Sequence, residues 1–361
     1  MIRPSSPGAH GDGGNPASGG GGWLARVLFR LAGLLVLSSS LAVGVLWYGW
    51  KAAMETPIRV PDEGLIYEIP QGVSFRTIMQ DLARRGIVAK PFYLRVEARY
   101  SGDAGRIKAG EYLLNPGLTH RQLLDELVRG EVIQHTLTLV EGWTFPEMMA
   151  AVAGHDKLQA RLSESDPEAV MAALGRAGEH PEGRFLPETY HFPKGTTDVA
   201  FLAQAYRAME RVLAEEWSQR EVDLPYETPY EALIMASIVE KETGQAGERS
   251  EVAGVFVRRL RRGMRLQTDP TLIYGLGADF DGNLRRVDLR TDTPYNTYTR
   301  HGLPPTPIAM PGRAAIHATL HPAGGEALYF VSRGDGTHHF SATLREHQNA
   351  VNEYQRGRRS P

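Results

Sequence analysis

The chain has 361 residues, and its 40 basic and 42 acidic residues give a formal net charge of −2. This balance excludes the strong basic field typical of nucleic-acid-binding proteins, so we expect no nucleic-acid partner. The absence of cysteine excludes disulfides, thiolate metal sites and cysteine nucleophiles. The length suits about two domains at ~150 residues each.

The N-terminal segment predicts a membrane anchor. Residues 1–22 are rich in Gly, Ser and Pro, which predicts a disordered cytoplasmic tail. Leu31 to Trp50 then has twenty residues without a charge, enough for a helix to cross the hydrocarbon core. Arginines precede this run and aromatic residues end it, so we expect an anchor over 23–50, with everything after it outside the cytoplasmic (inner) membrane. The alternative, a cleaved signal peptide, has a shorter apolar core of about 7–15 residues.

Three similar segments follow the anchor. Each predicts a short strand, a glycine turn and a helix whose first N–H groups are capped by a hydroxyl. The turn and cap residues are Gly72 and Ser74, Gly117 and Thr119, and Gly142 and Thr144. Such units resemble LysM-type modules, which bind glycans containing N-acetylglucosamine, and they predict a LysM-like α/β subdomain over 58–144. The alternative is a spacer that holds the next domain away from the membrane.

Two helices of these segments have one apolar face each, and both faces predict a small sheet beneath them. The helices are expected over 75–85 and 121–129. Residues 145–225 predict further helices, interrupted by a loop over 183–190 that contains a helix-breaking proline. Near the C-terminus, Gly334-Asp335-Gly336 predicts a β-hairpin, followed by a helix over 343–354.

The clearest helix lies between Tyr226 and Gly244. Thr228 is its expected N-cap, Pro229 stands at the first position and Glu231 completes a capping box. Apolar residues occupy nearly every position between Glu231 and the C-terminal end, so we expect the helix to be buried on all sides.

Two glutamates, in the run Glu240-Lys241-Glu242, end this helix. The negative end of the helix dipole and burial against apolar residues both raise the pKa of a carboxyl group there. A carboxylic acid with a raised pKa suits proton donation near neutral pH. Periodicity alone does not choose between Glu240 and Glu242, and either could instead pair with a nearby base such as Arg249 or Arg258.

Several motifs resemble the endolytic murein transglycosylase (YceG-like) family. They include Ala236-Ser-Ile-Val-Glu-Lys-Glu-Thr243, Gly263-Met-Arg-Leu-Gln-Thr-Asp-Pro-Thr271 and Ile308-Ala-Met-Pro-Gly312, and the likeness covers roughly residues 60 to 357. In that family the first glutamate of the Glu-Lys-Glu-Thr run is catalytic, which assigns Glu240. The resemblance also implies peptidoglycan glycan strands as the substrate and the cell wall synthesis machinery as a partner.

The resemblance implies an α+β fold. It consists of a single N-terminal transmembrane helix, the small LysM-like subdomain and a mainly helical, lysozyme-like catalytic domain over 145–357 with a small β-hairpin. An enzyme of this class cleaves the bond between N-acetylmuramic acid and N-acetylglucosamine.

Two polar segments supply candidate residues for binding the glycan. They are Gln267, Thr268, Asp269, Tyr295, Asn296 and Tyr298. The polar side chains can hydrogen-bond to sugar hydroxyl and acetamido groups, while the tyrosine rings stack on sugar faces. Alternatively, Asp269 caps a helix that begins at Pro270, and Asn296 belongs to a rigid loop among prolines.

The C-terminal histidines, His317 and His321 among them, show no His-Glu-x-x-His motif, and we expect no helix pairing at i, i+4 between them. We therefore expect neither a metal nor a cofactor. A glycoside hydrolase usually needs two carboxylates, whereas Glu242 points roughly 200° away from Glu240 around the helix. Asp269 and Asp292 are possible second carboxylates, but their turn-like settings favour capping roles. A lone acid favours attack by the substrate's own C6 hydroxyl, which leaves a 1,6-anhydro end. The alternatives are a peptidoglycan glycoside hydrolase and a non-catalytic, membrane-tethered peptidoglycan-binding scaffold.

Overall fold

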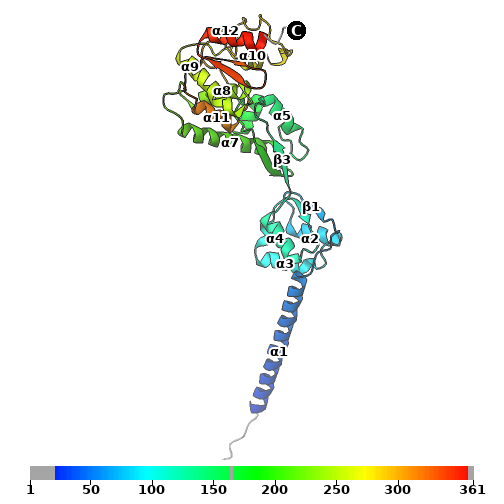
Figure 1. Ribbon diagram of the computed structural model, residues 1–361. Coiled ribbons are helices and arrows are strands. Elements are labelled where there is room, and N and C mark those ends of the chain that lie inside the picture. Colours follow the sequence, from blue (N-terminus) through cyan, green and yellow to red (C-terminus); the bar gives the residue numbers. More distant parts are fainter. Residues whose placement is uncertain (1–20, 163–165, 357–361) are drawn as a thin grey trace, which may run out of the picture. The chain divides into compact units, whose positions relative to one another are not determined.

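The computed structural model describes residues 21–162 and 166–356 (Figure 1). Within these residues, helices combine with three two-stranded antiparallel sheets, which confirms the mixed α and β character. The chain divides into two compact units, with the boundary between Glu131 and Val132. Most of the predicted tail over 1–22 lies outside the described residues.

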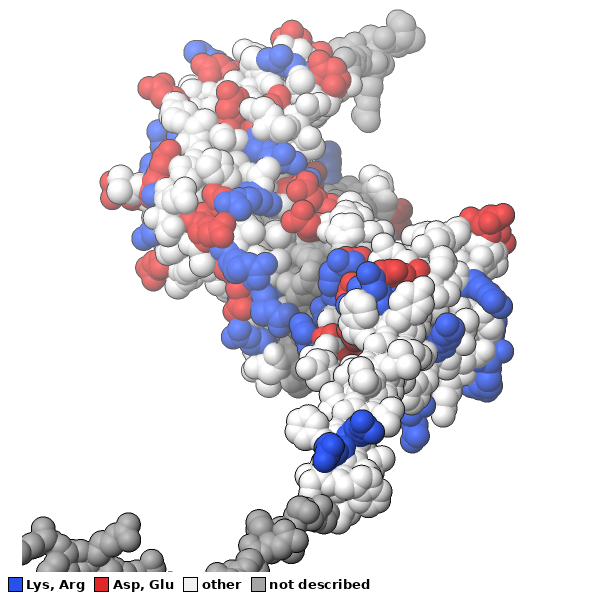
Figure 2. Space-filling model, turned by 90° about the horizontal axis from the view of Figure 1, so that it is seen from below, with Lys and Arg blue, Asp and Glu red and all other residues white. Residues whose placement is uncertain are grey.

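The first unit begins with the long helix α1, Gly21–Met54. Its residues 22–54 have a mean hydropathy of 1.9 over the most apolar window, and none of that window is buried. Among the described residues, this is the one helix long and apolar enough to span a membrane. In Figure 2 the helix that leads to the grey N-terminal trace is almost entirely white, because charged side chains are rare along it.

A two-stranded sheet and three helices complete the first unit. Strands β1 (Leu65–Ile69) and β2 (Gly110–Leu114) pair antiparallel, with Tyr67 opposite Tyr112. The helices are α2 (Phe75–Arg84), α3 (Pro91–Tyr100) and α4 (His120–Arg129), with a 3-10 turn over Asp103–Gly105.

The predicted caps and apolar faces of this unit are confirmed. Ser74 accepts the Thr77 N–H, and Thr119 forms a capping box with Gln122. The leucines of α4 and the apolar face of α2 are buried, as the 3.6-residue period requires.

The third strand–turn–helix segment belongs to the second unit, whereas the sequence analysis placed it in the LysM-like subdomain. Its strand β3 (Gln134–Thr138) pairs antiparallel with β4 (Thr189–Pro193), and its helix is α5 (Phe145–Ala153). Strand β4 overlaps the segment expected to be a loop. Local similarity predicts the strand, but its pairing partner is set by long-range packing.

The second unit is mainly helical. Its remaining helices are α6 (Pro167–Ala173), α7 (Asp198–Ser218), α8 (Pro229–Glu242), α9 (Arg249–Arg261), α10 (Asp269–Leu276), α11 (Arg313–Leu320) and α12 (Leu344–Val351). Short turns cover Ala246–Glu248 and Gly277–Asp279, and a π-turn covers Asn352–Arg356. The predicted hairpin is confirmed as β5 (Tyr329–Ser332) and β6 (His338–Ser341).

Helix α8 forms the centre of this unit. It packs against α7, α9, α10 and α11 (Figure 1). Every residue from Ala232 to Val239 is buried, which confirms the prediction of a helix covered on all sides. The core therefore fixes the position of the two glutamates at the C-terminal end of α8.

Candidate functional site

The sequence fixes both ends of α8. The Thr228 hydroxyl accepts the Glu231 N–H at 3.2 Å, and Glu231 completes the predicted capping box. The helix ends at Glu242 because Thr243 has an extended backbone, one residue before the glycine expected to stop it. Glu240 and Glu242 thus stand in the last turn but face different surroundings.

Glu240 belongs to a polar group that we call the Glu240 cluster, made of Glu240, Arg249, Glu141 and Gly312. The Gly312 N–H donates to Glu240 Oε2 at 2.9 Å, and Arg249 Nη2 lies 3.7 Å from Glu240 Oε1. The same Arg249 nitrogen lies 3.8 Å from Glu141 Oε2. Arg249 therefore stands between two carboxylates, and one of them is Glu240.

Burial raises the pKa of Glu240 above its ordinary value. Its side chain is only 6% exposed, so water stabilises the carboxylate poorly. The Gly312 hydrogen bond and the charge of Arg249 oppose this increase in pKa, while the negative charge of Glu141 adds to it. The raised pKa that the helix end predicted is confirmed, with burial as the main cause.

Backbone hydrogen bonds hold the segment that supplies Gly312. The Ile308 N–H donates to the Ser237 hydroxyl on α8 at 3.0 Å. Met310 bonds in both directions to the 142–143 segment, because its N–H donates to Trp143 and its carbonyl accepts from Gly142. The Gly312 N–H is therefore presented to Glu240 by backbone that is tied to both neighbours.

Glu242 faces the other way, into a cleft of about 510 Å³. We call this the Glu242 cleft; its polar lining includes Glu242, Gln267, Asp269, Tyr298 and His338. Burial raises the pKa of Glu242 to about 7, and the nearby Asp269 charge adds to this effect. Aromatic side chains of β5 line the cleft as well, so it offers both polar groups and ring faces.

Four of the predicted glycan-binding residues gather at the Glu242 cleft. The buried Thr268 hydroxyl donates to Glu242, and the Tyr298 hydroxyl donates to Asp269. Gln267 is exposed at the rim, with a backbone φ of 50° that is unusual for a residue other than glycine. Asp269 is the first residue of α10, so its carboxylate bonds across to Tyr298 from the start of that helix.

The other two predicted residues are occupied within their own loop. Asn296 is fully buried, and its amide nitrogen donates to the carbonyls of Asp288 and Thr291. Tyr295 shares a hydrogen bond with Thr306 and packs against the Tyr274 ring. The structure thus gives Asn296 the loop-stabilising role that the sequence left open, because a saturated buried amide has no donor left for a sugar.

Neither Gly312 nor Glu141 stands out in the sequence as a site residue. Gly312 ends the quoted Ile308-Ala-Met-Pro-Gly312 motif, so a signal was present without a role attached to it. Glu141 directly precedes Gly142, the turn glycine of the third strand–turn–helix segment, and that pattern gives the carboxylate no role. Its position next to Arg249 depends on the pairing of β3 in the second unit.

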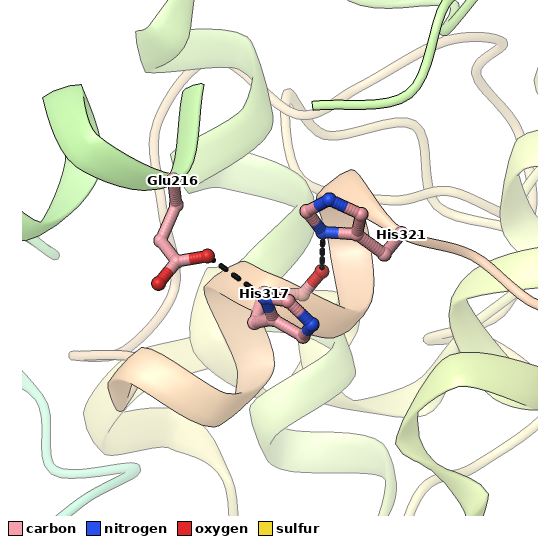
Figure 3. A group of neighbouring side chains, drawn as sticks. All are labelled: Glu216, His317 and His321. Atoms are coloured by element: carbon pink, nitrogen blue, oxygen red, sulfur yellow. Dashed lines mark hydrogen bonds and ion pairs between the residues drawn. The ribbon is translucent and has the colours of Figure 1, made fainter. Parts of the chain in front are cut away.

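A third polar group lies between α7 and α11 (Figure 3). Within the described chain, Glu216, His317 and His321 form the single group of three potential metal ligands, with one ligand atom from each lying within 4.8 Å of the others. Both Glu216 oxygens are engaged, by Arg313 at 2.7 Å and by His317 at 2.8 Å. His317 and His321 stand four residues apart on α11 and its C-terminal cap, contrary to the expectation of no such pair, and their imidazole rings stack with centroids 4.2 Å apart. The hydrogen bonds of Glu216 on α7 to Arg313 and His317 on α11 join the two helices.

Sequence comparison places the chain in a family. Residues 67–353 match the profile of the YceG-like family, and the chain belongs to that family. It is 30% identical over 328 residues to the endolytic murein transglycosylase of Bacillus subtilis, covering 86% of this chain and 90% of that protein. It is 27% identical to the endolytic murein transglycosylase of Streptococcus pneumoniae, where the match covers 89% of this chain and 64% of that protein.

A solved structure gives the same picture of the fold. The putative YceG-like protein lmo1499 from Listeria monocytogenes is 29% identical and superposes with a TM-score of 0.51. The match covers 80% of this chain and 100% of that one.

Proposed function

We propose that this protein is a peptidoglycan lytic transglycosylase that cuts within glycan strands and leaves 1,6-anhydro-N-acetylmuramic acid ends. The observation that carries the proposal is the buried Glu240 carboxyl group with its raised pKa, held by a backbone N–H and an arginine at the end of a core helix. Membership of the YceG-like family and relatives named endolytic murein transglycosylase support the same activity.

Glu240 acts first as an acid and then as a base. Its carboxyl proton passes to the glycosidic oxygen between N-acetylmuramic acid and N-acetylglucosamine, and the bond from that oxygen to C1 breaks. The C6 hydroxyl oxygen of the muramoyl residue bonds to C1, and Glu240 takes the hydroxyl proton. The proton that Glu240 gave to the glycosidic oxygen is thereby replaced by the proton of the C6 hydroxyl, and no water enters the reaction.

Arg249 and Gly312 serve the second half of this cycle. When Glu240 has given up its proton, the carboxylate accepts from the Gly312 N–H and faces the Arg249 guanidinium. Both contacts favour the ionised form, which keeps the raised pKa from becoming so high that proton release stalls.

The Glu242 cleft binds further sugars of the strand, on the side of α8 that faces away from Glu240. Gln267 and Asp269 offer hydrogen bonds, and Tyr298 offers a ring face. The buried Thr268 contributes by holding Glu242 in place through its hydroxyl. Tyr295 and Asn296 contribute by fixing the loop that carries Tyr298, because Asn296 Oδ1 accepts the Tyr298 N–H at 2.9 Å.

The first unit holds the enzyme at the inner membrane. Helix α1 spans the bilayer once, with its N-terminus in the cytoplasm, and residues after it lie outside the cytoplasmic membrane. The LysM-like region contacts glycan or spaces the catalytic domain, whose lysozyme-like core lies in the second unit. From this position the enzyme trims nascent strands next to the cell wall synthesis machinery.

One observation favours a glycoside hydrolase as the second candidate. Glu141 places another carboxylate beside Glu240, with Arg249 between them. A hydrolase needs such a second carboxylate, either as a nucleophile or as the base that activates water. Glu141 is about half exposed, so water reaches it readily.

Digestion of purified peptidoglycan in oxygen-18 water decides between the two. The full chain in detergent should release muropeptides that end in anhydromuramoyl residues without the label. Reducing ends that carry oxygen-18 would overturn the transglycosylase, and their loss in Glu141→Gln would establish the hydrolase. A variant lacking Glu240 should release neither product.

A further inference from the structure

Helix α3 is fixed to the C-terminal end of α1. The Trp50 indole N–H on α1 donates to Glu97 Oε2 on α3 at 3.0 Å, and the Tyr93 hydroxyl lies against Gly49. The Arg121 guanidinium covers the other part of the Trp50 ring, 5.4 Å from its centroid. The orientation of α3 therefore follows the orientation of α1 where the apolar helix ends.

A groove of about 840 Å³ runs beside α3. Three arginines line it, namely Arg76, Arg95 and Arg99, together with the apolar side chains of Phe92 and Val96. Phe92 is 65% exposed and Val96 is 46% exposed. In Figure 2 blue side chains border white surface on the underside of this unit.

The charges of these arginines are not balanced by the protein. Among the described residues, none of the three has an acidic side chain within ion-pair distance. Other arginines of the unit do have such partners: Arg84 pairs with Asp81, and Arg106 pairs with Asp103. An unpaired cluster of this kind is suited to a polyoxygen anion, because guanidinium groups bind phosphate bidentately.

We propose that this groove binds the phosphate headgroups of anionic phospholipids, phosphatidylglycerol in particular, in the leaflet where α1 ends. The inference rests on the proposed membrane anchoring by α1. The exposed Phe92 and Val96 lie at the level of the headgroups, where aromatic and aliphatic side chains gain by leaving water. The arginines meet the negative lipid surface, and the unit lies on the bilayer with α3 against it.

The alternative occupant is a glycan, as a LysM-like unit would suggest. Uncharged sugar rings give unpaired arginines no counter-charge, and the groove lies on the helix packed against the end of the span. These two features favour the lipid surface.

The absence of cysteine from the chain permits a clean test by site-specific labelling. Tyr100 at the end of α3 is 94% exposed and does not line the groove, so a Tyr100→Cys variant can carry an environment-sensitive fluorophore. The full-length protein is reconstituted into phosphatidylcholine vesicles with or without phosphatidylglycerol, which gives the vesicle a negative surface. Headgroup-labelled nitroxide lipids then measure proximity by quenching.

We expect several-fold stronger quenching in vesicles that contain phosphatidylglycerol. Combining Arg95→Gln with Arg99→Gln should return quenching to the level seen in phosphatidylcholine alone. Arg129→Gln is the matched control, because this arginine pairs with Glu131 and does not line the groove. It should leave the quenching unchanged, and circular dichroism checks that each variant is folded.

Each remaining outcome overturns a defined claim. If the protein fails to float with the vesicles, membrane anchoring fails and the inference fails with it. If it floats but the label does not respond to phosphatidylglycerol, or responds equally in the double variant, the lipid groove is refuted while anchoring stands. If soluble glycan fragments shift the label in neutral vesicles and phosphatidylglycerol does not, the groove is a glycan site.

Discussion

Replacing Glu240 with glutamine tests the proposed acid while preserving the shape of the site. The amide oxygen of glutamine can still accept the Gly312 N–H, whose nitrogen lies 2.9 Å from Glu240 Oε2 in the parent protein. The variant loses the transferable proton and the charge 3.7 Å from Arg249, but Arg249 keeps Glu141 as a partner. The fold should therefore survive, and the chemical step should not.

The expected loss is a factor of about 10²–10⁴ in kcat, the usual contribution of a positioned general acid or base. This range corresponds to ~2.7–5.4 kcal/mol in the activation barrier. Release of muropeptides from purified peptidoglycan gives the rate, and thermal unfolding checks that the Tm is unchanged.

Glu242→Gln is the matched control, two residues along the same helix. Its hydroxyl partner Thr268 can still donate to the amide oxygen, so the cleft should keep its shape. We expect measurable turnover, with a change in KM larger than the change in kcat. An inactive Glu242→Gln beside an active Glu240→Gln would refute the reasoning and place the acid on the cleft face of α8.

Arg249→Gln removes a charge that lowers the pKa of Glu240, so that pKa should rise further and the alkaline fall in activity should move to higher pH in a pH–rate profile. An unmoved alkaline limb would show that Glu240 is not the titrating acid. Glu216→Gln should lower the Tm, because the carboxylate joins α7 to α11 through His317 and Arg313. Burial opposes ionisation of Glu216, but these hydrogen bonds lower its pKa, so the stabilisation is present above the unfolded pKa of about 4.3 and is lost as pH falls through the folded value. The Tm difference between Glu216→Gln and the parent should therefore vanish in acid. A constant difference would contradict the proposed role of the Glu216 carboxylate in joining α7 to α11. A reporter enzyme fused to the C-terminus should be active only outside the cytoplasmic membrane, and cytoplasmic activity would reverse the proposed topology.

The local features of the fold were predictable from short stretches of sequence. Caps such as Thr228 and Thr119 act within three residues of themselves, and the apolar period of α2 and α4 defines their buried faces without reference to distant residues. The same holds for the hairpin around Asp335, whose turn chemistry is local. The raised pKa of Glu240 also followed from its place at the end of an apolar helix.

Tertiary structure alone decided which residues meet around each glutamate. The helical period separates Glu240 from Glu242, but only packing could show that Thr268 and Asp269 lie on the Glu242 side and that Gly312 and Glu141 lie with Glu240. The sequence by itself determined the apolar N-terminal helix, the buried α8 and the acidic end of that helix, since each depends on neighbours within a few turns. The pairing of β3 with β4, the saturated amide of Asn296 and the three polar groups depend on contacts between segments far apart in the chain, which no local pattern encodes.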